Sequence, residues 1–323
     1  MAPGRQRIEG VKVLKFRKYS PYLAGLVFSS IFGFSFLFTK EGLELMSPFH
    51  LLGFRFAVAF LCLSILKFTG IIKINLKGKN LKKLFLLALF QPGIYFICET
   101  TGMLYTTSSE AGMMIALIPV AVTILAALIL NEKPTFIQSI FVALSVGGAF
   151  FIIINRGASP IAGNFIGLIL LGGAVIAAGF YNIISRQLSL EFKPVEITYV
   201  MMGFGALLFN MIAIYRKNFA FGSYLNLLTN TDVLLTVGYL GIFSSVVAFF
   251  MMNYTLSKIT AAESAVFANL TTVVSIIAGV VFRDEPFFKF QVVGAVLIII
   301  GVWGTNYFGR PVVEKGEEIY EKV

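Results

Sequence analysis

The chain has 323 residues, of which 58% are hydrophobic and only 13% are charged, whereas soluble domains average about 45–50% apolar and about 25% charged residues. The apolar residues come in blocks of roughly 20, the length of a membrane-crossing helix, which argues against a soluble globular protein. The formal net charge of +10 is expected to reflect basic loops that set membrane topology and not binding of nucleic acid.

Ten apolar blocks follow one another along the chain, and short loops rich in Gly, Pro, Asn and charged residues separate them. Their approximate ranges are 22–39, 49–68, 84–104, 108–130, 136–154, 163–184, 195–215, 233–253, 262–282 and 288–308. Spans of a β-barrel would alternate over about 10 residues, and no such alternation is present. The sequence therefore predicts an all-α membrane protein with ten transmembrane helices.

The two ends of the chain are predicted to lie on the same side of the membrane. Lys and Arg concentrate before the first block and in the loop between the second and third blocks, and such residues favour the cytoplasmic side. Residues 1–20 lack a short apolar core with a cleavage site, so they are predicted to form a retained basic cytoplasmic tail. Residues 310–323 are predicted to form a cytoplasmic C-terminal tail.

A shift of 153 positions places the polar residues of one stretch on those of another. The pairs are Thr107 and Thr260, Glu110 and Glu263, Glu132 and Glu285, and Gln138 and Gln291. Polar residues are scarce in this chain, so these coincidences indicate a duplicated architecture. The copies begin at the fourth and the ninth predicted helices, and because this offset of five helices is odd the copies must cross the membrane in opposite directions.

A weaker repeat at a shift of 146 positions pairs Lys40 with Arg186. Together the repeats predict a first five-helix half at 21–155 and a second, inverted half at 156–309. Inverted halves of this kind give secondary transporters two interchangeable states around a central site.

The duplicated stretches resemble a known family. The first reads YTTSSEAGMMIALIPVAVTILAALILNEKP and the second reads KITAAESAVFANLTTVVSIIAGVVFRDEP. They resemble the paired EamA domains of the drug/metabolite transporter (DMT) superfamily over nearly all of 22–308. The resemblance implies a ten-helix, multi-pass exporter of the inner or plasma membrane that moves amino acids, metabolites or drugs by alternating access. It also implies a central cavity surrounded by spans 1, 3, 4, 6, 8 and 9.

Two charged residues lie inside predicted helices at a similar depth from the outer side, Arg55 in the second and Glu99 in the third. A charge within a span costs about 2.5–3.5 kcal/mol on insertion scales, so it indicates a partner or a function. Three interpretations remain open. The two residues form a buried ion pair, or one of them is functional, with Arg55 as a carboxylate clamp or Glu99 as a proton-coupling group, or either side chain snorkels to the interface.

A polar stripe runs along the third predicted helix, where Gln91, Tyr95 and Glu99 are spaced by four residues. The stripe either lines a cavity or packs against polar neighbours. Pro92, next to Gly93, is expected to kink this helix.

Further candidates for substrate binding or coupling are polar residues in otherwise apolar helices of the second half. They are Tyr181, Asn182, Asn253, Asn269 and Thr272.

The repeated Thr–Glu pairs are predicted to be structural. Thr107 with Glu110, and Thr260 with Glu263, both fit the capping box, in which the two side chains satisfy the first free amides of a helix. Unsatisfied amides in a membrane cost several kcal/mol, so capping alone explains the repeat.

No catalytic or metal-binding set is apparent, because the chain has one His and two Cys, both Cys in apolar blocks. It also lacks a phosphate-binding GxxxxGK[ST] loop. The sequence therefore predicts no enzyme activity, no metal and no cofactor.

The expected partners are a small-molecule substrate, the lipid bilayer, and a proton or another coupling ion. The alternatives are a nucleotide-sugar-like exchanger of the same superfamily and a membrane scaffold or sensor without transport.

Overall fold

The computed structural model of the protein describes residues 3–106, 108–130, 134–155, 165–216, 225–284 and 289–308, and these are helical without any strand. The first half contains α1 (Pro3–Leu45), α2 (Pro48–Phe68), α3 (Leu81–Ala88), η1 (Leu89–Ile94), α4 (Tyr95–Gly102), α5 (Ser108–Ile115), α6 (Ile118–Leu125), η2 (Ala126–Leu130) and α7 (Phe136–Asn155). The second half contains α8 (Phe165–Leu188), α9 (Pro194–Arg216), η3 (Asn226–Thr229), α11 (Thr231–Gly238), η4 (Tyr239–Ala248), α12 (Phe249–Leu256), α13 (Ala261–Arg283) and α14 (Lys289–Tyr307). The prediction of an all-α fold is confirmed for this part of the chain.

Seven helices among the described residues are long and apolar enough to cross a membrane. Three shorter apolar helices, Ile118–Leu130, Phe136–Gly148 and Val292–Thr305, stand where the sequence predicts spans four, five and ten. The helix at span four is shorter than a membrane-crossing helix because α5 ends at Ile115 and α6 begins only at Ile118, just before Pro119. Proline has no N–H to continue the hydrogen-bond ladder of the preceding turn, so the helix is interrupted there.

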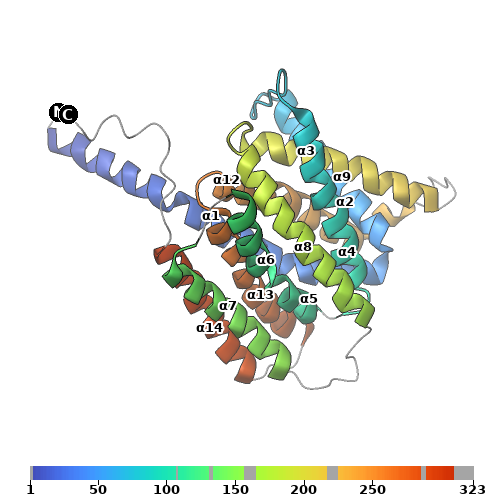
Figure 1. Cartoon of the computed structure of the whole chain (residues 1–323). Helices are drawn as coiled ribbons and strands as arrows, with labels where there is room; N and C mark the ends of the chain where they lie inside the picture. Colours follow the sequence, from blue (N-terminus) through green and yellow to red (C-terminus); the bar gives the residue numbers. More distant parts are fainter. Residues whose placement is uncertain are drawn as a thin grey trace.

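The helices pair across the two halves (Figure 1). Helix α7 lies along α14, and α2 packs against α9. Helix α1 packs mainly against η4, α12 and α13 of the second half, while α8 packs mainly against α4, α5 and α6 of the first half. Each contact made by a helix of the first half therefore has a counterpart made by the equivalent helix of the second half, as expected for a repeat.

This pairing divides the centre of the molecule into two packing groups. We define the first packing group as α1 with η4, α12 and α13, and the second packing group as α8 with η1, α4, α5 and α6. Each group thus combines the first helix of one half with later helices of the other.

The third span changes direction at the polar stripe. Gln91 has non-helical torsion angles (φ −148°, ψ 117°) between helical neighbours. Pro92 follows it and cannot donate to the helical ladder. The predicted kink is present, and it separates α3 from α4, which carries Tyr95 and Glu99.

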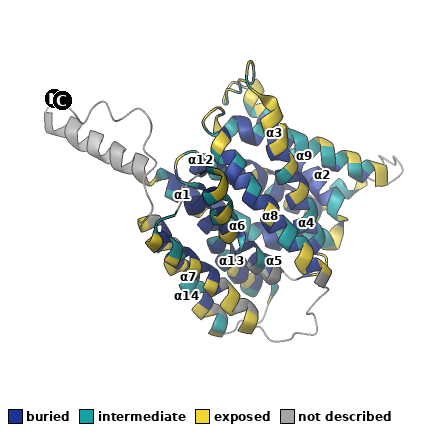
Figure 2. Cartoon of the chain, in the orientation of Figure 1, coloured by how far each residue is buried: buried dark blue, intermediate teal, exposed yellow. Residues whose placement is uncertain are grey.

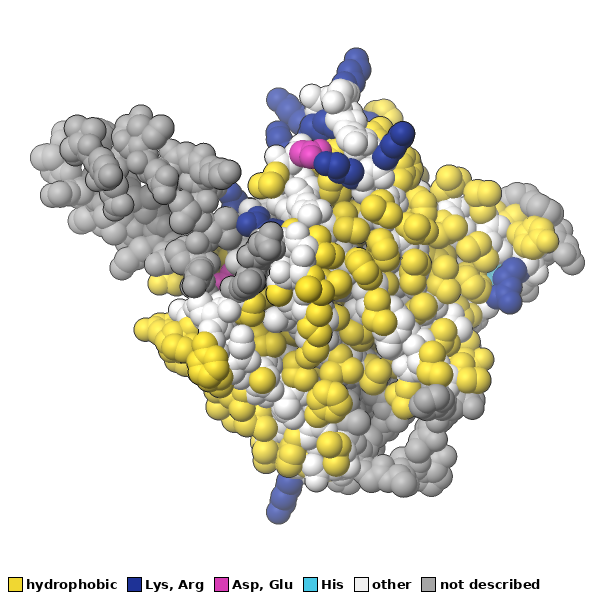
Figure 3. All heavy atoms as spheres, in the orientation of Figure 1, with side chains coloured by type: hydrophobic (Ala, Val, Ile, Leu, Met, Phe, Trp, Pro, Cys, Tyr) yellow, Lys and Arg dark blue, Asp and Glu magenta, His cyan; other side chains and the backbone are white. Residues whose placement is uncertain are grey.

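The surface carries many exposed large apolar side chains, such as Leu128 and Ile154, both about three-quarters exposed (74% and 75%). Figure 2 shows dark-blue buried residues inside and yellow exposed residues around the outside of the bundle. Figure 3 shows apolar side chains over most of this face and Lys and Arg gathered at the end that carries α3. A surface of this kind is adapted to lipid and would promote aggregation in water.

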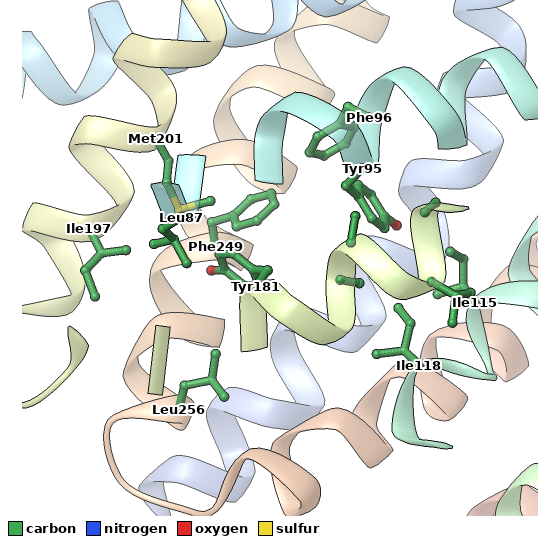
Figure 4. Packing of buried hydrophobic residues seen from close by; sticks show 14 of the residues in the cluster. Leu87, Tyr95, Phe96, Ile115, Ile118, Tyr181, Ile197, Met201, Phe249 and Leu256 are labelled. Carbon is green, nitrogen blue, oxygen red and sulfur yellow. The ribbon is translucent and has the colours of Figure 1, made fainter. Parts of the chain in front are cut away.

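The buried core runs between the packing groups. Figure 4 shows Tyr95 and Phe96 of α4, Ile115 and Ile118 beside them, and Tyr181 of α8 near Phe249 of α12. The rings of Tyr181 and Phe249 are 6.2 Å apart in an edge-on arrangement, a geometry that aromatic pairs prefer.

Candidate functional site

A cavity of about 60 Å³ lies between the two packing groups, and a site needs about 10–15 Å³ per water molecule, so several would fit. Its lining comes from the first packing group, from the second, and from α2 through Arg55. The lining residues are Phe28, Phe32, Ser35, Phe36, Arg55, Gln91, Tyr95, Phe96, Glu99, Ile115, Ile118, Ala178, Asn182, Phe249, Met252, Ser264, Ala265, Ala268 and Thr271. The spans that the resemblance implied all contribute.

Arg55 is only 2% exposed and is held by side chains of η4. Its Nε donates to the Ser245 hydroxyl at 2.8 Å, and its Nη2 donates to Ser244 at 2.7 Å. The guanidinium also lies over the ring of Phe96, 4.5 Å from the centroid, a favourable cation–π arrangement. Within the described residues Nη1 has no hydrogen-bond partner, so this edge of the guanidinium is available to the cavity.

Glu99 lines the same cavity and is 4% exposed. Its Oε2 accepts one hydrogen bond, from the Thr100 hydroxyl at 2.9 Å. Among the ion pairs of the described residues, none joins Glu99 to Arg55. The structure therefore forms no direct ion pair between them: the serines of η4 hold the guanidinium, and the two opposite charges attract each other only over a longer distance. Burial also excludes snorkelling of either side chain.

Three uncharged polar side chains complete the polar part of the cavity. Gln91 Oε1, Asn182 Oδ1 and Ser264 Oγ are buried and have no hydrogen-bond partner in the part of the chain that the structure describes. Asn182 Nδ2 donates to the Ala178 carbonyl at 2.8 Å, which orients its oxygen. Buried polar atoms normally have partners, so these three point to a ligand or to water.

The rest of the cavity wall is aromatic. Phe32 of α1 meets Phe249 of α12 edge-on, with centroids 5.2 Å apart, and Tyr95 meets Phe96 at 4.9 Å. Phe28 and Phe36 of α1 add to this wall. The cavity therefore combines one cation, one carboxylate and a large apolar surface.

Two of the other candidate residues, Tyr181 and Asn253, lie outside the cavity lining. The Asn253 Oδ1 accepts hydrogen bonds from the hydroxyls of Tyr181 (2.8 Å) and Ser185 (2.7 Å), and its Nδ2 donates to Thr198 at 3.1 Å. Asn253 thus joins α12 to α8 and α9. Tyr181 and Asn182 are neighbours, and only Asn182 faces the cavity, because adjacent helical residues point about 100° apart.

Asn269 and Thr272 of α13 also face neighbouring helices. Asn269 Nδ2 donates to the Ser145 hydroxyl of α7. Thr272 donates to the Gly112 carbonyl of α5 at 2.5 Å. These polar groups connect helices, as hydrogen-bonding side chains do in membrane bundles.

The comparisons with known proteins agree with this architecture. The model of the EamA-like transporter family matches twice, at residues 20–154 and 165–307. The chain belongs to the EamA-like transporter family. The resemblance drawn from the duplicated stretches is confirmed, and the protein is a multi-pass transporter of the cell membrane.

Relatives of this EamA protein are transporters by name. An uncharacterized transporter of Bacillus subtilis, YcxC, is 35% identical over 91% of this chain and 95% of its own. An uncharacterized transporter of Archaeoglobus fulgidus is 27% identical over 85% of this chain and 94% of its own. A probable terminal-alkyne amino-acid exporter of Streptantibioticus cattleyicolor is 24% identical over 66% of this chain and 68% of its own.

A solved crystal structure has a TM-score of 0.66 to this EamA protein at 17% sequence identity. The alignment covers 90% of this chain and 99% of the other. At that identity the likeness shows a shared fold.

The predicted capping box is present at the second copy of the motif. Thr260 and Glu263 form a capping box at the start of α13, with the Thr260 hydroxyl accepting from the Glu263 amide and Glu263 accepting from the Thr260 amide. Thr107 and the side chain of Glu110 lie outside the described residues.

Sequence reasoning missed several residues of the site. Ser244 and Ser245, which hold Arg55, form an adjacent polar pair within an apolar span, and that pair was the available signal. Ser264 and the phenylalanines carried no such signal, because serine and phenylalanine are common in these helices. No cluster of His, Cys, Asp or Glu that could hold a metal occurs within the described ranges.

Proposed function

We propose that this EamA protein is a secondary active exporter that carries a small organic solute through the central cavity by alternating access. Ten spans in two inverted five-helix halves, with both termini in the cytoplasm, form the proposed topology. The pairing of α1 with the second half and of α8 with the first supports it, because this reciprocal exchange is what two halves related by a two-fold axis would show. Two equivalent packing groups on either side of one cavity provide two interchangeable states.

We further propose that the solute is an amino acid with an apolar side chain. The observation that carries this proposal is that Arg55 and Glu99 line one cavity and are not paired with each other. Arginine suits a carboxylate. Glu99, with the free oxygens of Gln91 and Asn182, suits an ammonium group, because all three accept hydrogen bonds. The phenylalanine wall suits an apolar side chain.

The alternatives fit the cavity less well. A nucleotide-sugar or phosphate-ester exchanger needs several cationic side chains to balance its cargo, and Arg55 is the only Lys or Arg among the described lining residues. A scaffold or sensor without transport has no need for opposite charges around an internal cavity, where burial of each charge is costly.

Counterflow in proteoliposomes tests this function. Vesicles loaded with unlabelled leucine or phenylalanine are expected to accumulate the labelled amino acid, and Arg55→Met is expected to remove most of this accumulation. Lys83→Met is the matched control, since Lys83 forms an exposed ion pair with Glu191 at 2.8 Å, away from the cavity. Accumulation by Arg55→Met equal to that of the Lys83→Met control would refute the role of Arg55.

A further inference from the structure

Two long basic side chains make the same kind of contact in the two halves of the molecule. Lys40 of α1 donates from Nζ to the carbonyls of Met103 and Thr106, both at 2.9 Å. Arg186 of α8 donates from Nη1 to the carbonyl of Leu256 at 3.3 Å. In each case a cation near the C-terminal end of one helix reaches carbonyls at the C-terminal end of another.

The two contacts are copies of each other in the repeat. Lys40 and Arg186 are equivalent at the shift of 146 positions, and Met103 and Leu256 are equivalent at the shift of 153 positions. Donor and acceptor are thus both conserved between the halves, although the basic residue changes from Lys to Arg.

Each contact joins one packing group to the other. Lys40 belongs to α1 of the first packing group and reaches the end of α4 in the second. Arg186 belongs to α8 of the second packing group and reaches the end of α12 in the first. The cavity lies between these groups, and its lining residues Phe36 and Asn182 each stand one helical turn before the basic residue. The contacts therefore flank the cavity.

We propose that Lys40 and Arg186 are the outer and inner latches of this cavity, and that transport requires each to release its carbonyls in turn. The proposal rests on the proposed alternating access, in which an inverted repeat places equivalent contacts at opposite membrane faces. The last carbonyls of a helix lack helical partners and carry the negative end of its dipole, so a cation bridges them well. Long side chains can release and reform such a contact without repacking the helices.

The latches differ in what supports them. At the inner latch, Asn253 of α12 also accepts hydrogen bonds from Tyr181 and Ser185 of α8. The counterpart of Ser185 at the outer latch is Thr39, whose buried hydroxyl has no partner in the described structure. The counterpart of Asn253 is Thr100, which donates to Glu99 instead. The inner end therefore keeps two hydrogen bonds between α8 and α12 when Arg186 is replaced, and loss of Lys40 should open the cavity more readily than loss of Arg186.

The rate at which a cysteine in the cavity is labelled from each membrane face reports whether the latch at that face is closed. Ser35→Cys places a reporter thiol in the lining, in a full-length chain whose own thiols are removed by Cys62→Ser and Cys98→Ser. A membrane-impermeant maleimide is applied to the outer or the inner face of oriented vesicles. Lys40→Met is expected to raise labelling from the outer face by about tenfold, the effect of losing about 1.4 kcal/mol of hydrogen bonding, and to leave labelling from the inner face unchanged.

Arg186→Met is expected to raise labelling from the inner face by less, and Arg186→Met with Asn253→Leu is expected to raise it further. Lys40→Arg, Arg186→Lys and the Lys83→Met control should label like the parent chain. Unchanged labelling in both Met variants, equal increases from both faces, or increases from the wrong face would each overturn the latches. The assay needs no substrate, so a parent protein that fails in counterflow refutes the exporter and leaves the latch result readable.

Discussion

The buried guanidinium of Arg55 is stabilised by protein contacts on one side and faces the cavity on the other. A charge inside a span costs about 2.5–3.5 kcal/mol on insertion scales. Two serine hydroxyls and the Phe96 ring offset this cost on one side of the guanidinium. The contacts use Nε and Nη2, so the geometry that holds Arg55 also directs its remaining edge at the cavity. Lysine could not reproduce this fork of donors.

The carboxylate of Glu99 permits a test of the proposed ammonium site. Glu99→Gln is expected to weaken binding of the amino acid by about tenfold or more, because a hydrogen bond to a charged group contributes about 1.5–3 kcal/mol. Isothermal titration with leucine in detergent measures this change. The carboxylic acid that lacks the amino group should bind the parent protein and Glu99→Gln equally, and weaker binding of that acid in the variant would contradict the assignment.

At the scale of elements, the crossing of α7 and α14 depends on glycines. A Cβ at Gly148 would lie 2.8 Å from the Gly294 carbonyl oxygen, and one at Gly301 would lie 2.7 Å from the Phe141 carbonyl oxygen. Gly148 and Gly301 are equivalent at the shift of 153 positions, so the repeat uses the same device twice. Small residues let membrane helices approach at backbone distance, where packing replaces the missing hydrophobic effect.

Gly148→Ala is therefore expected to destabilise the protein by about 1–3 kcal/mol, the cost of inserting a methyl group into a packed contact. A neighbouring glycine offers a matched control, because a Cβ at Gly147 meets nothing within 4 Å. Thermal unfolding in detergent, followed by loss of the monodisperse chromatographic peak, should show a lower midpoint for Gly148→Ala than for Gly147→Ala. Equal midpoints would mean that α7 and α14 tolerate a wider separation.

At the scale of the whole molecule, function depends on the relation between the halves. Helix α1 packs into the second half and α8 into the first, so neither half encloses a cavity without the other. At the cavity the two packing groups face each other with different side chains, largely polar on α4 and α8 and largely aromatic on α1. Motion of one group against the other would change access to the cavity while α7–α14 and α2–α9 stay paired.

The proposed topology requires both termini on the cytoplasmic side. Green fluorescent protein fused after Val323 should therefore fluoresce in a bacterial host, whereas alkaline phosphatase at the same position should be inactive. Fusion in the loop after Asn155, which follows the fifth span, should show the opposite pattern. An active phosphatase at the C-terminus would exclude an even number of spans with a cytoplasmic N-terminus.

The sequence by itself determined the helical class, the duplicated halves and the charged part of the candidate site. Polar residues are so scarce in these helices that Arg55, Glu99 and the Gln91–Tyr95 stripe stood out, and the structure places all four around one cavity. Their recognition needed only helical periodicity and the cost of a buried charge.

Only the tertiary structure decided which polar groups face the cavity and which face another helix. The rotation of α8 and α13 about their axes is set by packing with distant segments, and no local pattern encodes it. That rotation directs Asn182 of α8 into the cavity and turns Asn269 and Thr272 of α13 into contacts between helices, and the packing of α12 does the same for Asn253. The packing of α2 against η4 likewise gives Arg55 its serine partners, so Arg55 and Glu99 line one cavity without a direct ion pair between them.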